Sequence, residues 1–260
     1  MIKAQSHKNE EEDLRSYTGR DFHTISILPI MKNIDILYED ADCVVLNKPA
    51  GLAVQGGTNI TISLDDLLAS EWNQRPFLVH RLDKDTSGLL LVAKTKEAAA
   101  YYSGIIAGKG AEKRYMAVCL GLIQPDTGKI DEPIRIRGTE RASLTFYHRI
   151  ANSETTSLVE LQLGSGRMHQ IRRHLASIGH PIIGDDKYGD FSLNKALKKD
   201  RGIKKMLLHA SQLRFPHRTT KKIIEVKAPL PDYMYAFLYK EYPIKEIKNL
   251  LGLTYSLMGS

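Results

Sequence analysis

The sequence has little of what builds cross-linked or membrane-embedded proteins. Two cysteines among 260 residues are too few for a disulfide framework or a four-cysteine zinc site. Apolar runs such as residues 88–93 fall well short of the ~20 residues that cross a bilayer. Residues 1–13 are polar and lack the apolar centre of a secretion signal. We therefore expect a cytoplasmic protein that does not bind membranes.

Several cofactor motifs are also absent. The sequence contains neither a Walker A motif nor an EF-hand loop, so nothing indicates an energy-coupled or calcium-dependent reaction.

Cys43 and Cys119 each lie in an apolar, strand-like segment, where we expect free buried thiols.

The composition is that of an ordinary globular protein, with 42% hydrophobic and 26% charged residues. The net charge of +7 mildly favours a polyanionic partner. Residues 194–222 hold ten basic residues and one acidic residue, so their local excess exceeds that of the whole chain. This stretch, which includes Lys198, Lys199, Lys204 and Lys205, is either a solvated face or a surface that follows RNA phosphates.

Hydrophobic patterning predicts strands and helices in an irregular order. The predicted strands are 43–47, 77–79, 89–93, 114–120, 142–150, 156–163, 207–215 and 222–226. The predicted helices are 64–72, 96–107 and 169–177, and the C-terminus is also expected to be helical. This order favours an α+β fold with a mixed, mainly antiparallel sheet. We expect a polar extension over 1–33, one catalytic domain over 34–243 and a helical tail over 244–260.

Residues 80–88, with the sequence HRLDKDTSG, form a polar loop between two apolar strand candidates. Loops that a sheet holds in place often carry catalytic groups. The alternative is a solvated turn whose small and polar residues serve turn geometry. Asp83 and Asp85 would also suit the carboxylate pair of a glycoside hydrolase, but residues two apart are poorly placed to span a sugar bond.

A second polar motif covers residues 164–174, with the sequence GSGRMHQIRRH, between a strand and a helix. Its amides and arginines could face phosphates. A nicotinamide fingerprint is disfavoured because His169 replaces the third glycine, although Asp185 has the right spacing for a ribose-binding acid. Zinc is also disfavoured because His169 and His174 are five residues apart; core or backbone hydrogen bonding is the more ordinary role for both.

Four motifs together resemble those of the RluA-type pseudouridine synthases. They are the loop at 80–88, KRY at 113–115, the motif around 166–174 with residues 179–189, and LHASQLRF at 208–215. The resemblance covers residues 36–233, and their order along the chain makes it specific. It implies a pseudouridine synthase fold and an enzyme that isomerises uridine in structured RNA.

The resemblance also implies roles for individual residues. Asp83 would be the nucleophile, attacking either the ribose or the uracil ring. Arg167 would pair with Asp83, and Tyr115 would pack on the target base. Because the reaction detaches uracil and reattaches it through a ring carbon, it needs no cofactor and no metal. The target uridine would leave its stack, with Arg81 occupying the vacated space.

The remaining expectations concern the RNA. His80, Arg81, Arg172 and Arg173 are candidate RNA contacts beside the four lysines named above. Residues 54–57 and 185–190 are most similar to the RluC-like branch that modifies large-subunit ribosomal RNA. That branch commonly carries an N-terminal S4-type domain, of which residues 16–30 would be a remnant. Transfer RNA as substrate and a non-catalytic RNA-binding module are the alternatives. A monomer is the default expectation.

Overall fold

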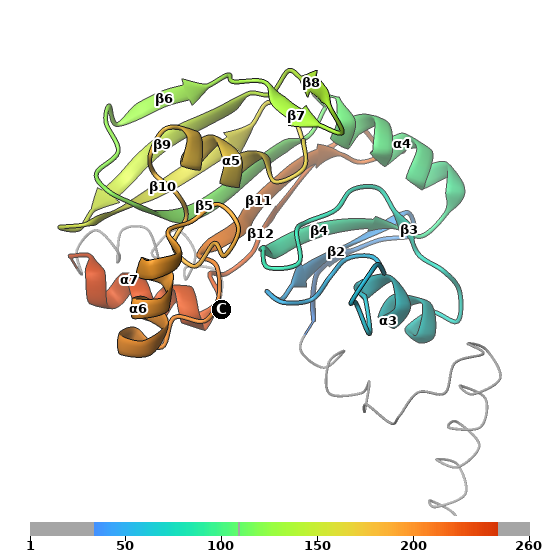
Figure 1. Cartoon of the computed structure of the whole chain (residues 1–260). Helices are drawn as coiled ribbons and strands as arrows, with labels where there is room; N and C mark the ends of the chain where they lie inside the picture. Colours follow the sequence, from blue (N-terminus) through green and yellow to red (C-terminus); the bar gives the residue numbers. More distant parts are fainter. Residues whose placement is uncertain (1–33, 109, 244–260) are drawn as a thin grey trace, which may run out of the picture. The chain divides into compact units, whose positions relative to one another are not determined.

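The fold is built on a ten-stranded sheet, shown in Figure 1. The structure is a computed structural model and describes residues 34–108 and 110–243. The predicted N-terminal extension and C-terminal tail lie outside the described residues. The strands of the sheet are β1 (Asp35–Glu39), β2 (Cys43–Lys48), β3 (Phe77–Leu78), β4 (Ser87–Ala93), β5 (Glu112–Leu120), β6 (Thr127–Ile130), β9 (Thr145–Asn152), β10 (Thr156–Leu163), β11 (Leu208–Pro216) and β12 (Ile223–Lys227).

The strand order is β1-β2-β4-β11-β5-β10-β9-β6, with β12 on β11 and β3 on β4. Within this sheet β4 and β11 pair in parallel, and the other pairs are antiparallel. A separate hairpin joins β7 (Ile134–Ile136) to β8 (Thr139–Arg141). The helices are α3 (Leu64–Glu71), α4 (Lys96–Ala107), α5 (Gln170–Ser177), α6 (Phe191–Arg201) and α7 (Asp232–Glu241). The predicted α+β class with a mixed, mainly antiparallel sheet is confirmed.

Two cores fill the two halves of the sheet. In the first, Tyr102 and Ile106 of α4 pack with apolar residues of β2, β4, β11 and β12. In the second, Phe237 and Leu238 of α7 pack against β5 and β10. Burying these side chains supplies the main favourable free energy of folding. None of the described helices is long and apolar enough to cross a membrane.

Local capping signals identified two helices correctly. Ser63 and Asp66 form the expected capping box of α3, with the Asp66 amide donating to Ser63 Oγ over 3.3 Å. Thr95 Oγ1 accepts from the Ala98 amide over 3.1 Å, and α4 ends before Gly108 as predicted. Both cysteines are free and buried, also as predicted.

The sequence patterns did not predict β1, β6, the β7–β8 hairpin or α6. Helix α6 has no fully buried residue, and its apolar face is narrow, with the half-buried Leu193 and Leu197 packed on the second core. Its ends did carry signals. Asp190 caps the first turn by accepting the Leu193 amide, and Gly202 ends the helix with a φ of 69°.

Gly88 lies where the two parallel strands meet, and its backbone has a φ of 104°. A Cβ added there would lie 2.2 Å from the Ala210 carbonyl oxygen. Ser87 Oγ beside it hydrogen-bonds His209 Nδ1 over 2.9 Å, which further joins β4 to β11. This close approach of two backbones places the loop before β4 next to β5 and β11.

We expect Gly88→Ala to lower the free energy of unfolding by about 3 kcal/mol or more, because it combines backbone strain with a steric clash. The control is Gly104→Ala within α4, where an added Cβ meets nothing within 4 Å. That control should stabilise the protein by about 0.5–1 kcal/mol. Urea unfolding followed by circular dichroism measures both. Equal stabilities of the two variants would contradict this account of the β4–β11 contact.

Candidate active site

A cavity of about 320 Å³ lies where the loop before β4, strand β5 and the start of α5 meet. The three predicted catalytic residues, Asp83, Tyr115 and Arg167, all line it. They are spread over 84 positions of the sequence, and the sheet brings them together. His80, Arg81 and Arg172 also line this cavity.

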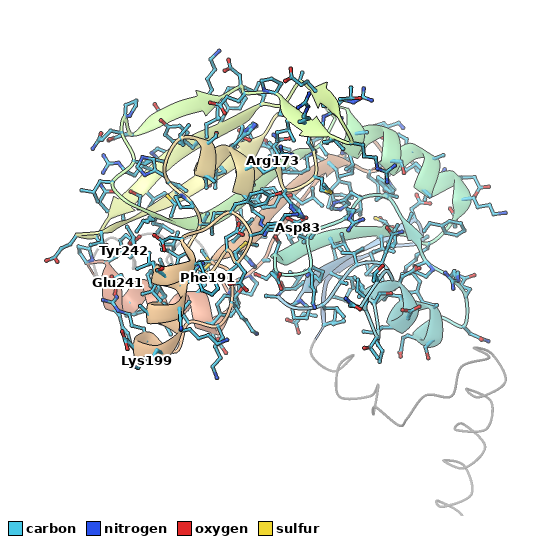
Figure 2. All side chains as sticks on the ribbon, viewed as in Figure 1. Asp83, Arg173, Phe191, Lys199, Glu241 and Tyr242 are labelled. Atoms are coloured by element: carbon cyan, nitrogen blue, oxygen red, sulfur yellow. The ribbon has the colours of Figure 1, made fainter. Side chains whose placement is uncertain are left out.

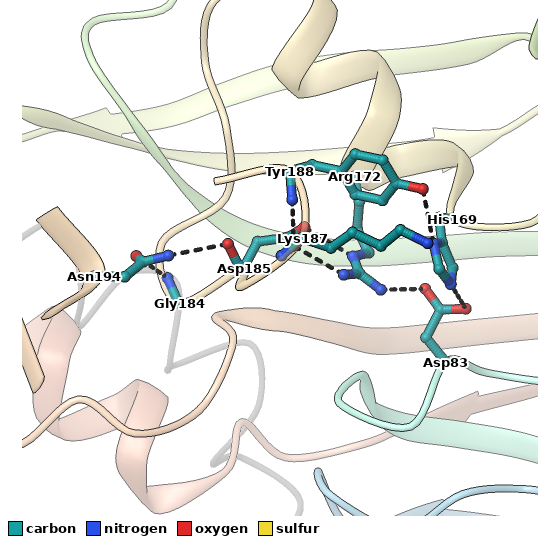
Figure 3. A network of polar contacts seen from close by, with 8 residues as sticks. All are labelled: Asp83, His169, Arg172, Gly184, Asp185, Lys187, Tyr188 and Asn194. Atoms are coloured by element: carbon teal, nitrogen blue, oxygen red, sulfur yellow. Dashed lines mark hydrogen bonds and ion pairs between the residues drawn. The ribbon is translucent and has the colours of Figure 1, made fainter. Parts of the chain in front are cut away.

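Asp83 lies in the loop before β4, and its side chain is 20% exposed, which leaves it accessible from the cavity. The Thr86 amide donates to the Asp83 carbonyl over 3.1 Å and closes a turn around it. Each carboxylate oxygen of Asp83 faces a different group (Figure 3). Arg172 Nη1 donates to Oδ2 over 3.2 Å, and His169 Nε2 lies 3.6 Å from Oδ1.

The arginine that pairs with Asp83 is Arg172, which corrects the assignment of that role to Arg167. Arg172 lies in the first turn of α5, while Arg167 precedes the helix. Arg167 is exposed at the cavity, and its Nε donates to the Ala142 carbonyl over 3.3 Å. Arg172 was also predicted to contact RNA; its guanidinium is buried and binds two carboxylates of the protein.

Asp185 holds the other edge of the Arg172 guanidinium. Arg172 Nε and Nη2 each donate to the Asp185 carboxylate over 2.8 Å, in a bidentate pair. Burial alone would lower the pKa of Arg172, but Asp185 and Asp83 together raise it. The guanidinium therefore keeps its positive charge beside Asp83. This use of Asp185 also removes the basis for a ribose-binding role.

Further hydrogen bonds bind both the carboxylate and the backbone carbonyl of Asp185. Its Oδ1 also accepts the amides of Lys187 and Tyr188, and its carbonyl accepts from Asn194 Nδ2 on α6 (Figure 3). Burial alone would raise the pKa of Asp185, but the Arg172 guanidinium and these amides lower it. The network joins α5, residues 184–190 and α6 to the loop before β4 that carries Asp83.

Tyr115 projects from β5 into the cavity wall and is buried. Burial and the nearby charge of Asp83 raise the pKa of its hydroxyl. Tyr115 is therefore protonated at neutral pH and presents an aromatic ring to whatever fills the cavity.

Two buried lysines bind backbone carbonyls beside the cavity, and neither was predicted from the sequence to belong to the site. Lys48 Nζ donates to the carbonyls of Pro49, Leu52 and Lys84, and so ties the catalytic loop to the turn after β2. Burial lowers the pKa of Lys48 to about 7. Lys113 Nζ donates to the Ile106 carbonyl over 2.9 Å, and burial lowers its pKa. Lys48 precedes the sequence Pro-Ala-Gly, which is typical of a turn and does not indicate a buried lysine.

The two histidines of the second motif have different roles. His174 is buried and hydrogen-bonds Thr145 Oγ1 over 2.9 Å and the Glu132 carbonyl over 3.0 Å, as expected for a structural histidine. His169 instead faces Asp83. His80, a candidate RNA contact, accepts the Leu91 amide at Nε2, and burial lowers its pKa to about 3. The Nε2 of His80 is thus occupied by a hydrogen bond from β4.

The other candidate RNA contacts lie around the cavity on separate elements. Arg81 is exposed at the cavity, whereas Arg173 on α5 donates to the Arg135 carbonyl over 3.0 Å. The four predicted lysines, Lys198, Lys199, Lys204 and Lys205, are exposed on α6 and the segment after it. Figure 2 shows Lys199 on α6 and Arg173 on α5.

The basic stretch 194–222 is not a single surface. Strand β11 separates α6 from the turn after residue 216, and nine residues of strand span about 30 Å. Arg214 forms ion pairs with Glu112 and Glu225, and Arg218 pairs with Asp42. Arg201 pairs with Glu241. Within this stretch, the lysines of residues 195–205 take part in none of these ion pairs.

The comparisons with known proteins agree with this geometry. Residues 42–177 match the model of the RNA pseudouridylate synthase family, so the match spans the catalytic loop, β5 and α5. The chain is 36% identical to the uncharacterized RNA pseudouridine synthase YlyB of Bacillus subtilis (strain 168), covering 88% of this chain and 80% of that protein. It is 35% identical to tRNA pseudouridine synthase C of Haemophilus ducreyi, covering 80% of this chain and 96% of that protein.

A further relative is ribosomal large subunit pseudouridine synthase C of Vibrio cholerae, 34% identical over 79% of this chain and 68% of its own length. Among solved structures, human RNA pseudouridylate synthase domain containing 4 superposes with a TM-score of 0.68 at 26% identity. That superposition covers 82% of this chain and 94% of the human chain. The chain therefore belongs to the RNA pseudouridylate synthase family. It is an isomerase, as the resemblance of its four motifs implied.

We expect Asp185→Asn to destabilise the protein by about 3 kcal/mol at pH 7, because it leaves the buried Arg172 without one of its two carboxylates. Since folding lowers the pKa of Asp185, its carboxylate stabilises the native state above the unfolded pKa of about 3.9. That contribution is lost as the pH falls from the unfolded pKa through the lower pKa of the folded state. The difference in the free energy of unfolding between wild type and variant should therefore become smaller below about pH 4.

Urea unfolding at several pH values between 7 and 3.5 measures this difference. Asp186→Asn, at the exposed neighbouring position, is the matched control and should change stability by less than about 0.5 kcal/mol. A variant as stable as wild type at pH 7 would show that the bidentate pair does not support the fold.

Proposed function

We propose that this enzyme converts uridine to pseudouridine in structured RNA with Asp83 as the nucleophile. The observation that carries the proposal is the geometry of the Asp83 carboxylate, which opens to the cavity and is bound by Arg172 on its other side. A carboxylate attacks as a nucleophile in its ionised form, and the hydrogen bond from Arg172 orients the carboxylate of Asp83. The carbon atom attacked, on the ribose or on the uracil ring, stays open.

Tyr115 and Arg81 complete the proposed chemistry. The target uridine must leave its stack to reach a cavity of this kind, which costs least in loops and single strands. We place the uracil ring against Tyr115, whose protonated side chain offers an aromatic face. Arg81 is exposed at the same cavity, where its side chain can occupy the space that the base vacates.

The RNA backbone would be held by the lysines of α6 and the following segment. Asn194 of α6 hydrogen-bonds the Asp185 carbonyl, so this helix begins close to the network that holds Asp83. Lysines on such a helix can neutralise phosphates on both sides of the target nucleotide. Arg173 remains a candidate phosphate contact, because its guanidinium is exposed beyond the bond to Arg135.

We propose 23S ribosomal RNA as the substrate, on the basis of relatives such as the Vibrio cholerae ribosomal large subunit synthase. Transfer RNA is the second candidate, favoured by the Haemophilus ducreyi tRNA synthase, because the alignment covers 96% of that relative. Mapping pseudouridines in both RNAs from cells with and without the protein distinguishes these targets. All the proposed reacting groups come from one chain, so we propose a monomer that acts in the cytoplasm without metal or cofactor.

Asp83→Ala should abolish turnover, because no other carboxylate replaces the nucleophile. Tritium release from RNA labelled at the uracil ring carbon measures the reaction, since that hydrogen leaves when the new bond forms. We expect a loss of at least about a thousandfold, the scale seen when a nucleophile is removed. Asp85→Ala, two residues away and exposed, is the control and should keep most of the activity. Undiminished release from the Asp83 variant would refute the proposed nucleophile.

Replacing Lys198, Lys199, Lys204 and Lys205 together by alanine should weaken RNA binding and flatten its salt dependence. The slope of log affinity against log salt should fall by up to about three, since each phosphate contact contributes roughly 0.7–0.9. The control is the Lys221→Ala, Lys222→Ala double variant, at the far end of β11, where we expect no change in slope. Filter binding at several salt concentrations gives the slopes. Equal slopes for wild type and the quadruple variant would make α6 a solvated face.

A further inference from the structure

His169 has an unusual backbone and an unused capping position. It is the residue before α5, with a φ of 53° and a ψ of 30°, in the left-handed region that side chains rarely adopt. Serine, threonine, aspartate and asparagine are preferred at this position, because their side-chain oxygens accept an amide of the first helical turn. The His169 side chain makes no such bond. A residue that holds this backbone conformation without capping the helix indicates a role for its side chain elsewhere.

The His169 ring lies between Tyr188 and Asp83 (Figure 3). Its Nδ1 is 3.0 Å from the Tyr188 hydroxyl, and its Nε2 is 3.6 Å from Asp83 Oδ1. The Tyr188 ring packs edge-on against the imidazole, with 5.6 Å between the centroids. Because Arg172 binds the other oxygen of Asp83, the two carboxylate oxygens have one partner each.

The charges around His169 determine its protonation. Asp83 and Asp185 face it with negative charge, Arg172 and Lys187 with positive charge, and Tyr188 with a neutral hydroxyl. Burial lowers the pKa of His169, Asp83 opposes this, and Arg172 and Lys187 add to the lowering. The imidazole is therefore neutral at pH 7, with one nitrogen that donates and one that accepts.

The Asp83 carboxylate determines which nitrogen of His169 carries the hydrogen. A carboxylate oxygen opposite Nε2 favours an N–H on that nitrogen, and Nδ1 is then the nitrogen that accepts from the Tyr188 hydroxyl. This tautomer directs the N–H dipole toward Asp83. The opposite tautomer would direct a lone pair at the carboxylate, which is repulsive.

We propose that His169 is a positioning residue for Asp83, held by the Tyr188 hydroxyl as the neutral Nε2–H tautomer. It fixes the rotation of the carboxylate together with Arg172. A second cation would bind the carboxylate more tightly and make it a weaker nucleophile, whereas a neutral N–H orients it at lower cost. The inference rests on the proposed role of Asp83 and assigns two further residues to that site.

Two substitutions of similar size distinguish the effect of the N–H donor at residue 169 from the effect of side-chain volume. His169→Gln and His169→Met both place an unbranched side chain on the same left-handed backbone, but only glutamine carries an N–H donor. We expect His169→Met to lower kcat about tenfold or more with KM for RNA nearly unchanged, since misplacing a reacting group affects the chemical step. His169→Gln should recover kcat to within about threefold of wild type. Equal losses in the two variants would overturn the proposal.

The tautomer can be observed directly by nitrogen-15 NMR of protein labelled in histidine. We expect the His169 signals, assigned by their absence in His169→Gln, to report an Nε2–H tautomer in the wild type at pH 7.5. Tyr188→Phe keeps the ring that contacts Arg172 and Lys187 and removes only the hydroxyl, so the tautomers should mix and kcat should fall. Tyr239→Phe, on the exposed face of α7, is the control.

An Nδ1–H tautomer in the wild type would overturn the proposal whatever the variants do. The NMR measurement does not depend on catalytic activity. If Asp83→Ala kept full activity, the proposed nucleophile would fail while the tautomer would still report the arrangement of His169 and Tyr188.

Discussion

The active site depends on one buried guanidinium held between two carboxylates. Arg172 donates twice to Asp185 and once to Asp83, and it is almost completely removed from solvent. A charge in that position costs several kcal/mol unless hydrogen bonds satisfy it. The fold must therefore bring α5, residues 184–190 and the loop before β4 together for Arg172 to be stable. The same guanidinium that binds Asp185 also holds the carboxylate of Asp83, the proposed nucleophile.

The network also joins the candidate active site to the helix proposed to bind RNA. Asp185 accepts from Arg172 and from backbone amides, and its carbonyl binds Asn194 at the start of α6. The lysines of α6 are thus carried on an element that is anchored to the catalytic network. A base entering the cavity and phosphates lying along α6 would meet one rigid framework, which favours precise placement of the target uridine.

Local signals predicted local structure well. The caps of α3 at Ser63 and of α4 at Thr95 involve residues only three apart, so both helices could be predicted from the sequence. Helix α6 was not predicted because its apolar face consists of only the half-buried Leu193 and Leu197. In the same way, residues 194–222 looked like one basic surface, whereas β11 divides them and acidic residues far along the chain pair with Arg214 and Arg218.

The sequence by itself determined the family of this protein through four motifs in order, and it supplied a candidate aspartate, a candidate tyrosine and a basic stretch. Only the tertiary structure decided which groups act on one another. Arg167 and Arg172 belong to the same motif, but only the second lies in the turn of α5 that faces Asp83. His169 was expected to be an ordinary structural histidine, yet its left-handed backbone turns the ring toward Asp83. Side-chain direction depends on backbone conformation and on neighbours distant in sequence, so a linear motif lists the reacting groups without their partners.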